Sequence, residues 1–326
     1  MDKIREHADK IERALSNDGA AKNAVTASWQ RSKELHNLNP REHRAPERLS
    51  EHELKQSRER MGAFLNTAEP CLDRLFLAVG NSGCCVLLAD RNGVPVSRRG
   101  AVQDDEIFNE WGLWTGVLWG EDSEGTNGIG TSLAEERSLT IHKDQHYHSK
   151  NTALSCTAAP IFDHEGQLIA AVDVSSCRAD LTSEFSNLIS LAVVDAARRI
   201  ETEHFRNSFS NAQIVFATPQ EDRVSSLTDR QGTALLAVDM DGLVIGATRR
   251  ARRCYGLNDD DFSNPLPLAN IYGDQSNHAE RLGHAESKII QQVMASSGGN
   301  VSKAARSLGV SRSTLHRKIK KFKSPK

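Results

Sequence analysis

The stretch at residues 298–323, GGNVSKAARSLGVSRSTLHRKIKKFK, predicts two short helices joined by a turn. Apolar residues recur at helical spacing in both halves: Val301, Ala305 and Leu308 in the first, and Leu315, Ile319 and Phe322 in the second. Asn300 is placed to cap the first helix, and Gly309 is placed to end it. Two amphipathic helices that share a small core across a Gly-containing turn form a helix-turn-helix.

The opposite face of the second predicted helix carries side chains that hydrogen-bond base edges or phosphates. The residues that we expect to contact DNA are Ser311, Arg312, Ser313, Thr314, His316, Arg317, Lys320 and Lys321. The alternative is a small basic hairpin whose charges are merely solvated. Packing, turn and charge patterns coincide in this stretch and favour DNA binding.

Charge is distributed unevenly along the 326 residues, although the net charge is only −2. Residues 281–326 hold eleven Lys and Arg against one acid, Glu286, whereas the preceding 280 residues hold 30 basic and 42 acidic side chains. An acidic body is thus joined to a basic module, which is typical of a protein that binds a polyphosphate.

Residues 285–323 resemble the Fis-type DNA-binding domain at the C-terminus of bacterial enhancer-binding proteins. The matching positions are Ala304, Ala305, Leu308, Gly309, Leu315 and Lys318. The resemblance implies a homodimer that places the helix near 312–322 in the major groove. An apolar stripe upstream would pair with its copy in that dimer, so we expect a palindromic operator in double-stranded DNA. The stripe consists of Leu282, Ile289, Ile290, Val293 and Met294.

The Gly-rich segment at residues 124–132, EGTNGIGTS, looks at first like a phosphate-binding loop. A P-loop requires a Lys directly before its Ser or Thr, and here Gly130 is followed by Thr131 and Ser132. No G-x-x-x-x-G-K-[ST] pattern occurs elsewhere in the chain. The sequence therefore gives no support to nucleotide hydrolysis.

Helical and strand periods alternate along the chain and predict an α+β fold. The first 80 residues are expected to be helical, with a capping box at 50–53. Strands are expected at 84–90, 94–97, 139–142, 155–162 and 168–174, followed by a helix at about 181–209. In that helix, Leu188, Leu191, Val194 and Ala197 lie near helical spacing. A hairpin at 235–246 precedes a helix at 248–255, and 258–277 reads as loop or linker.

The segment from about 84 to 200 resembles the GAF sensor domain of the acetoin-catabolism activator family, through EGTNGIGTSLAEERSLTIHKDQHY and SCTAAPIFDHEGQLIAAVDVSS. AVTASWQRS and LAVGNSG resemble the helical N-terminal part of these regulators, and residues 234–257 resemble a shortened PAS-like unit. The resemblance implies a helical region at 1–80, a GAF domain at 81–200, a connecting helix, PAS-like unit and linker at 201–277, and a Fis-type domain at 278–326. The central AAA+ ATPase domain of full-length activators has no counterpart in this sequence.

A GAF domain holds small ligands over one face of its sheet, and we expect an effector pocket there. The expected lining residues are Trp111, Trp114, Trp119, Asn127, Gly128, Ile129, Thr131, His146 and Cys156. Three of the four tryptophans crowd into 111–119, where their rings could wall a pocket or equally pack the core. The glycines would serve tight backbone geometry.

Metal, redox and enzymatic alternatives use overlapping residues. His142, His146, His148 and Cys156 could hold iron or zinc, but their spacing is not diagnostic, so we predict no metal and no cofactor. A GAF-type methionine sulfoxide reductase could use Cys84, Cys85 and Cys156, yet the cysteine pattern of that subfamily is not recognisable. An enzyme would not need the basic tail, and an architectural protein like Fis would not need the acidic body. We therefore predict that the chain is not an enzyme.

Composition excludes several other classes. No apolar run approaches the ~20 residues of a membrane span, and the N-terminus lacks the apolar core of a signal peptide. The six cysteines show no C-x-x-C spacing, so neither a disulfide framework nor a structural zinc site is indicated. We expect a cytoplasmic, homodimeric regulator of a catabolic operon that acts without its own ATPase, through RNA polymerase or a full-length activator.

Overall fold

The computed structural model of the chain describes residues 2–16, 23–178, 182–217, 232–272 and 300–308, together with residues 290, 293, 294, 297, 312, 314 and 315. The chain divides into two compact units, Met1–Leu266 and Pro267–Lys326. Helices and antiparallel strands are combined, which confirms the α+β prediction. Within the described residues, no helix is both long enough and apolar enough to cross a membrane.

The first unit begins with helices. They are α1 (Asp2–Ser16), α2 (Ala24–Gln30), the π-helical turn η2 (Arg31–Leu35) and α3 (Glu51–Val79). Ser50 and Glu53 form the predicted capping box at the start of α3, because each side chain accepts a hydrogen bond from the backbone of the other residue. Gly62, with φ +47°, bends α3 in its first half.

A five-stranded antiparallel sheet forms the centre of this unit. Its strands are β1 (Cys84–Asp90), β2 (Pro95–Arg99), β3 (Leu139–His142), β4 (Ser155–Phe162) and β5 (Leu168–Ser176). The spatial order is β2-β1-β5-β4-β3, with all neighbours antiparallel. The five predicted strands are thus confirmed within two residues. Short 3₁₀ turns lie in the connections: η3 (Gly80–Ser82) before β1, η4 (Val102–Asp104) after β2, and η5 (Lys143–Gln145) and η6 (Ser149–Asn151) between β3 and β4.

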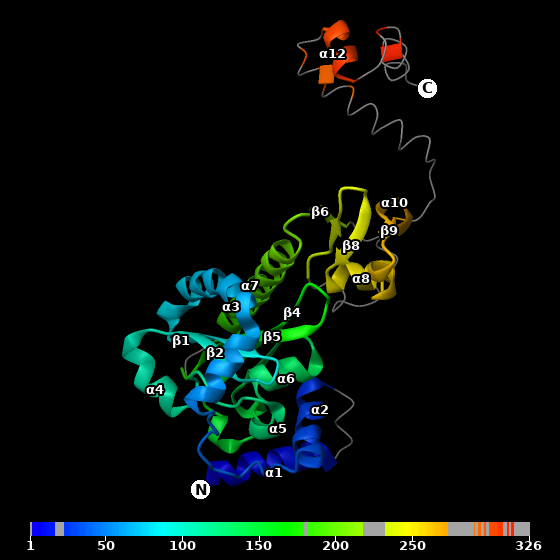
Figure 1. Cartoon of the computed structure of the whole chain (residues 1–326). Coiled ribbons are helices and arrows are strands. Elements are labelled where there is room, and N and C mark those ends of the chain that lie inside the picture. Colours follow the sequence, from blue (N-terminus) through cyan, green and yellow to red (C-terminus); the bar gives the residue numbers. More distant parts are fainter. Residues whose placement is uncertain are drawn as a thin grey trace. The chain divides into compact units, whose positions relative to one another are not determined.

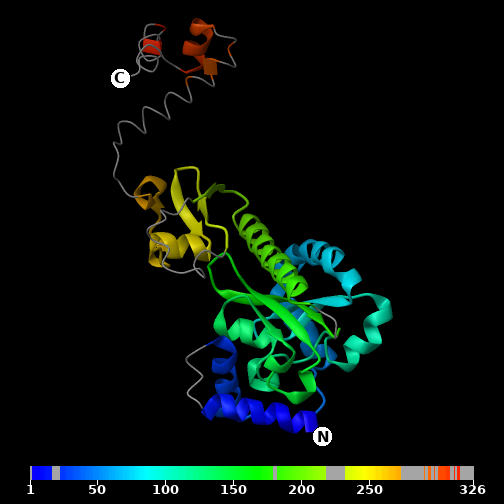
Figure 2. The same ribbon diagram turned by 180° about the vertical axis from the view of Figure 1, so that it is seen from behind.

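Helices α3 and α7 (Ser183–Ser208) lie side by side over one face of this sheet (Figures 1 and 2). The α7 residues that enter the core are Ile189, Val193, Ala196, Ala197 and Ile200. The sequence had indicated a stripe through Leu188 and Leu191, but these side chains are 62% and 70% exposed. The other two predicted positions are confirmed, because Ala197 is buried in the core and Val194 packs against it.

The opposite face of the sheet is covered by short helices and loops. These helices are α4 (Asp105–Glu110), α5 (Glu121–Glu124) and α6 (Gly128–Glu135). They close a second core, built on Leu87, Ala89 and Ala171 of the sheet and on Trp119 and Ile129 of the covering layer. Helix α2 and the turn η2 contact α5, and α1 contacts η6 (Figure 1). We call the side of the sheet that faces α6 the inner face.

A smaller sheet follows α7. It has the order β6-β7-β8-β9, with β6 (Gln213–Phe216), β7 (Leu235–Val238), β8 (Leu243–Ala247) and β9 (Leu266–Pro267). Helices α8 (Arg249–Tyr255) and α9 (Asp260–Ser263) belong to the first unit, and α10 (Leu268–Ile271) belongs to the second. The hairpin and α8 confirm the prediction. The described part of the expected loop after 258 instead holds two short helices and a strand, whose few residues carry no readable period.

The described part of the second unit contains the predicted first helix of the helix-turn-helix, α12 (Val301–Ser307). Asn300 caps it by accepting hydrogen bonds from the backbone N–H groups of Ser302 and Lys303, both at 3.1 Å. A small core gathers Ile290, Ala304, Ala305 and Leu315, with Val293 and Met294 packed against it. These members of the upstream stripe are thus covered within the same chain. Leu282, Ile289, Gly309, Ile319 and Phe322 lie outside the described residues.

Candidate sensor site and DNA-binding face

The Gly-rich segment that resembles a phosphate loop is the start of α6, and its polar groups are used inside the protein. The side-chain oxygen of Asn127 accepts the N–H of Gly130 at 2.8 Å and thereby caps the helix. The amide nitrogen of Asn127 donates to the carbonyls of Trp119, at 3.0 Å, and Gly125, at 2.8 Å. Asn127 thus fixes the segment to the loop before α5.

Two glycines of this segment allow α6 to lie close against the sheet and the loop before α5. A Cβ added to Gly128 would lie 2.7 Å from both Asp173 Oδ1 and Cys156 Cβ on the sheet. A Cβ on Gly130 would lie 2.5 Å from the backbone nitrogen of Glu121. Real Cβ atoms do not approach other atoms so closely, so α6 can seat on the inner face only with glycine at these positions.

A buried polar cluster joins α2 to the Gly-rich segment. The Ser28 hydroxyl donates to the carboxylate of Glu121 and lies 2.7 Å from the Thr126 hydroxyl and 3.2 Å from that of Thr131. Arg31 binds Glu121 through two hydrogen bonds, at 2.7 and 3.0 Å. These contacts hold together the AVTASWQRS and EGTNGIGTS stretches, which are far apart in the sequence.

The segment from 143 to 151 lies under the N-terminal helices. The indole of Trp29 donates to the carbonyl of Gln145 at 2.8 Å, and the Tyr147 hydroxyl donates to the carbonyl of Leu38 at 2.8 Å. The ring of His7 lies 3.0 Å from the Ser149 hydroxyl. The N-terminal helices therefore brace the loop that carries two of the predicted site histidines.

Several expected pocket residues meet over the inner face. Trp119, Ile129 and Cys156 belong to one buried cluster, and Trp111 and Trp114 pack against its edge. The Trp119 indole donates to the carbonyl of Gly112 at 2.8 Å. The tryptophans therefore pack the covering layer of the core.

Two expected pocket residues lie away from that cluster. The Thr131 hydroxyl donates to Glu121 at 3.2 Å and belongs to the contact with α2. The buried His146 ring hydrogen-bonds the carbonyl of Lys143 at 3.0 Å, in the loop under α1. The structure therefore separates these two residues from the tryptophans.

Sequence reasoning missed Asp173, the charged residue at the centre of the inner face. Its side chain is fully buried, and burial raises its pKa to about 7. Oδ2 accepts the Ser175 hydroxyl at 2.6 Å, whereas Oδ1 has no hydrogen-bond partner among the described residues. A lone acid inside the apolar strand LIAAVDVSS was a signal that could have identified it.

Strand register places a second missed charge in the same row as this acid. Leu87 pairs with Asp173 on one side and with Arg98 on the other, so all three point toward the inner face. The Arg98 guanidinium pairs with Asp105 at 2.7 Å and lies 4.1 Å from the ring centroid of Trp114. Its Nε and Nη2 have no hydrogen-bond partner among the described residues, and it lines a surface hollow with Trp114.

The weak metal candidates are not brought together. His142 Nδ1 lies 2.6 Å from the Ser155 hydroxyl, at the end of the sheet, whereas Cys156 points to the inner face. Burial lowers the pKa of His146 and of His148 to about 4, so both rings are neutral. Across the described residues, no three His, Cys, Asp or Glu side chains gather as metal ligands would.

The three cysteines considered for a redox site lie on two faces of the sheet. Cys84 packs with α3 and α7, whereas Cys85 and Cys156 lie in the core under α6. Burial raises the pKa of Cys85 and of Cys156 well above the usual range, which disfavours the reactive thiolate.

Of the residues expected to contact DNA, the structure describes two. Arg312 and Thr314 are helical, and the neighbouring Leu315 is fully buried in the core against α12. Ser311, Ser313, His316, Arg317, Lys320 and Lys321 lie outside the described residues. The register of Leu315 agrees with a helix whose apolar side faces α12.

Residues 281–322 match the family described as bacterial regulatory protein, Fis family. The chain is 31% identical over 228 residues to the acetoin catabolism regulatory protein of Cupriavidus necator, covering 70% of this chain and 34% of the relative. It is 32% identical over 178 residues to the acetoin dehydrogenase operon transcriptional activator AcoR of Bacillus subtilis, covering 54% and 29%. The chain thus spans about a third of the length of these curated relatives.

The crystal structure of the Escherichia coli DhaR(N)–DhaL complex contains a chain of similar fold. The TM-score is 0.50 at 18% identity, covering 72% of this chain and 76% of that chain. These comparisons confirm the resemblance to the acetoin-catabolism activators and to the Fis-type domain. Residues 3–202, more than half of the chain, match the family described as MimR, N-terminal domain. The chain therefore belongs to the family of proteins that carry the MimR N-terminal domain.

Proposed function

We propose that this chain is a sequence-specific DNA-binding transcription regulator whose N-terminal domain senses a small molecule. The observation that carries the proposal is the Fis-family match at 281–322, which coincides with the capped helix α12 and its small core. A segment with eleven basic residues and one acid is suited to the phosphate backbone. The regulator would act as a homodimer on a palindromic operator, with Arg312, His316 and Arg317 facing the DNA.

The effector would bind on the inner face of the five-stranded sheet. Thr131, in the contact with α2, and His146, in the loop under α1, would lie behind the residues that surround it. The surrounding residues would be Trp111, Trp114, Trp119, Asn127, Gly128, Ile129 and Cys156. Arg98 and Asp173 join this proposal, because each has at least one buried polar atom that lacks a partner among the described residues. Buried polar groups inside an apolar site supply the few directional contacts by which a small ligand is recognised.

Helix α7 is the proposed route from the sensor to the rest of the chain. It packs on the sheet through Val193, Ala197 and Ile200 and leads directly into β6. An effector that favours one position of the sheet would bias α7 and so the spacing of two DNA-binding units. The division into a helical region (1–80), a GAF domain (81–200), a connecting and PAS-like region (201–277) and a Fis-type domain (278–326) is part of this proposal.

The regulator would act without an ATPase of its own. Neither match includes residues 203–280, and this stretch contains no phosphate-loop pattern. It would therefore repress, activate through the housekeeping polymerase, or assist a full-length activator. Because two relatives are named for acetoin regulation, a catabolic operon is the proposed target. Open-complex formation that depends on ATP and on this protein alone would contradict this part of the proposal.

Genome-wide DNA occupancy, followed by gel shift on the strongest site, tests DNA recognition. Replacing Arg317 with Ala should cost specific binding about 1–3 kcal/mol and relax the preference at one base pair if Arg317 reads a base. Lys303→Ala on α12 is the matched control and should leave the specificity ratio unchanged. Diffuse occupancy without a motif would instead favour an architectural role.

A further inference from the structure

A hollow of about 350 Å³ lies beside β2, the edge strand of the five-stranded sheet. Helix α3 borders it through Leu65, β2 borders it through Val96 and Arg98, and the chain after α4 borders it through Trp114. Pockets that bind small molecules measure roughly 300–1,000 Å³ and are largely apolar, with a few fixed polar groups. The hollow has such a lining, so a small organic compound fits it.

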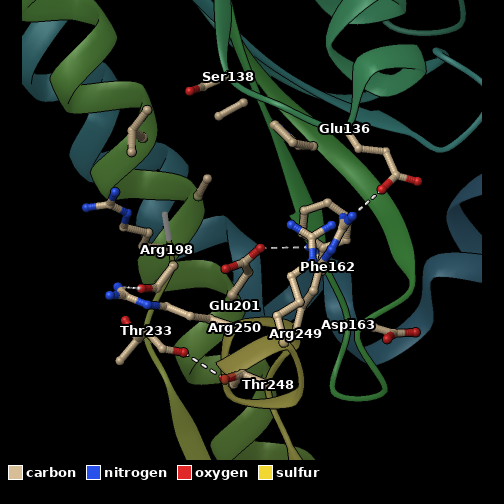
Figure 3. Close-up of a pocket in the computed structure, with 16 residues that line it drawn as sticks. Glu136, Ser138, Phe162, Asp163, Arg198, Glu201, Thr233, Thr248, Arg249 and Arg250 are labelled. Atoms are coloured by element: carbon tan, nitrogen blue, oxygen red, sulfur yellow. Dashed lines mark hydrogen bonds and ion pairs between the residues drawn. The ribbon is translucent and has the colours of Figure 1, made fainter. Parts of the chain in front are cut away.

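A second pocket, between the end of β4, α7 and the start of α8, is less suited to a ligand. It encloses about 80 Å³. Arg249 pairs there with Glu136, and Glu201 accepts the backbone N–H of Phe162 at 2.9 Å (Figure 3). Figure 3 also shows that the guanidinium of Arg198 is directed away from that of Arg249. The charged groups of that pocket therefore do not converge on one ligand.

Neighbouring side chains hold Arg98 in place at the hollow beside β2. Its side chain is 10% exposed, and Nη1 lies 2.7 Å from Oδ1 of Asp105, in an ion pair that is not aligned as a hydrogen bond. The guanidinium carbon lies 4.1 Å from the ring centroid of Trp114 and 5.6 Å from that of Phe108. An acid at one nitrogen and two aromatic rings beside the guanidinium orient it before any ligand binds.

One whole edge of this guanidinium lacks an acceptor. Nε and Nη2 of Arg98 are buried and have no hydrogen-bond partner among the residues that the structure describes. Arg31 uses the same two nitrogens to bind both oxygens of Glu121, at 2.7 and 3.0 Å. This two-point contact is the geometry in which arginine binds a carboxylate. Because a buried donor without an acceptor is costly, a carboxylate at this edge of Arg98 would be stabilising.

The hollow disfavours a cation. Glu69 lines it, but Oε1 of this acid accepts the Ser97 hydroxyl at 3.0 Å and Oε2 pairs with Arg99. The ring of Trp114, which would otherwise attract a cation, already carries the guanidinium of Arg98. The acid and the ring are thus both engaged, whereas Nε and Nη2 of Arg98 still need an acceptor. An anion therefore fits the hollow better than a cation.

We propose that this hollow binds a small carboxylate with an apolar body, whose carboxylate docks on Nε and Nη2 of Arg98. Leu65 and Val96 supply apolar walls that a hydrocarbon chain can contact, and inorganic phosphate gains nothing from them. Arg98 lies in the same row as Asp173 on the inner face, so the effector of the proposed function would be a small carboxylate. This last step rests on the proposed function, whereas the binding site does not.

Tryptophan fluorescence of the whole chain tests the site, because a carboxylate on Arg98 changes the surroundings of Trp114. The probes, at matched ionic strength, are butyrate, butyramide, which has the same shape but no charge, and inorganic phosphate. We expect a saturable change with butyrate, at a Kd at least ~10-fold below that of butyramide or phosphate, since only butyrate makes both the charged and the apolar contacts. A rise in thermal midpoint with butyrate provides a readout that does not depend on tryptophan.

Arg98→Lys keeps the positive charge but has no planar edge, so it should raise the Kd for butyrate ~10-fold. Arg99→Lys is the matched control, because Arg99 is the next residue on β2, lies outside the lining of the hollow, and pairs with Glu69 and Asp73 of α3. It should leave the Kd unchanged. Equal Kd values for butyrate and butyramide in the parent chain, an equal response to phosphate, or equal losses in the two variants would overturn the proposal.

Gel shift on the operator separates the site from the proposed function. Butyrate should change the affinity of the parent chain for the operator and should leave that of the Arg98→Lys variant unchanged. Butyrate binding without any change in the gel shift would overturn the effector assignment. A chain that binds butyrate but no specific DNA would instead contradict the proposed function and support the binding site.

Discussion

Arg31 and Glu121, which are far apart in sequence, form a two-point contact: Nε lies 2.7 Å from Oε2, and Nη2 lies 3.0 Å from Oε1. A third hydrogen bond joins Nη1 to Glu135 at 2.7 Å. Glu121 opens α5 and Glu135 ends α6, so one guanidinium holds both ends of the Gly-rich wall. The N-terminal helices are therefore a structural part of the sensor domain.

Replacing Arg31 with Ala should lower the free energy of unfolding by about 2–3 kcal/mol, because the buried Glu121 would lose its counter-charge. This cost is smaller than the cost of breaking a fully buried ion pair, since the Arg31 side chain is 30% exposed. Urea denaturation followed by tryptophan fluorescence measures the change.

Arg41→Ala is the control for the Arg31 variant. Arg41 also contacts two acids, Asp9 and Glu12, but its side chain is 46% exposed, so its loss should cost less than about 1 kcal/mol. Adding Glu121→Gln to Arg31→Ala should recover part of the lost stability, since the uncompensated charge disappears. Equal effects of the Arg31 and Arg41 variants would contradict the role assigned to this contact.

Gly130→Ala should destabilise the protein by about 1–3 kcal/mol, the usual cost of overpacking. Its Cβ would meet the backbone nitrogen of Glu121 at 2.5 Å and the carbonyl oxygen of Trp119 at 2.7 Å, and backbone atoms cannot rotate away. In an open helical site the same change would stabilise by about 0.5–1 kcal/mol. The sign of the change in thermal midpoint therefore decides whether α6 is seated as closely as the structure shows.

Local features were predictable from the sequence because neighbouring residues determine them. The capping box of Ser50 and Glu53 and the cap at Asn300 each depend on four or fewer consecutive residues. The hairpin of β1 and β2 follows from two short runs of strand-forming residues joined by a Gly-containing turn. The order of strands and helices, and with it the α+β class, was predicted from such local signals and from the family resemblance.

Features that depend on register were not predictable. Leu87 brings Arg98 and Asp173 into one row only because β1 pairs with both β2 and β5, and no short sequence pattern specifies that order. The exposed Leu188 is a similar case, since several residues of α7 lie at helical spacing and tertiary packing selects the buried ones. The contact between Ser28 and Glu121 likewise joins two docked segments.

Asn300→Ala should destabilise α12 by about 1 kcal/mol, because two backbone N–H groups lose their acceptor. Hydrogen exchange at the amides of Ser302 and Lys303 measures the effect within this helix. Asn300→Asp keeps an acceptor at the cap and should exchange like the parent protein. Unchanged protection in the Ala variant would show that the side chain does not cap the helix.

The pH dependence of stability should report Asp173. Burial raises its pKa to about 7 in the folded protein, whereas in the unfolded chain the pKa of Asp is about 4, as it is in model peptides. At a pH between these two pKa values, the folded state holds a proton that the unfolded state has released. Its contribution to stability is therefore complete below pH ~4 and falls as the pH rises to ~7, by about 1.4 kcal/mol per pH unit.

Asp173→Asn cannot titrate, so it should lose less stability between pH 5 and pH 8 than the parent protein, as measured by chemical denaturation at each pH. Glu201, whose pKa burial also raises to about 7, contributes a fall of the same sign, so a smaller slope should remain. Adding Glu201→Gln should remove that remaining fall. A rise with pH should then appear, because burial lowers the pKa of His146 and of His148 to about 4, and the unfolded state binds these protons more strongly. Asp241→Asn, in the exposed turn between β7 and β8, is the control and should keep the parent slope. A parent-like slope in the Asp173 variant would mean that this carboxyl titrates normally, and the inner face would then lose its proposed neutral acid.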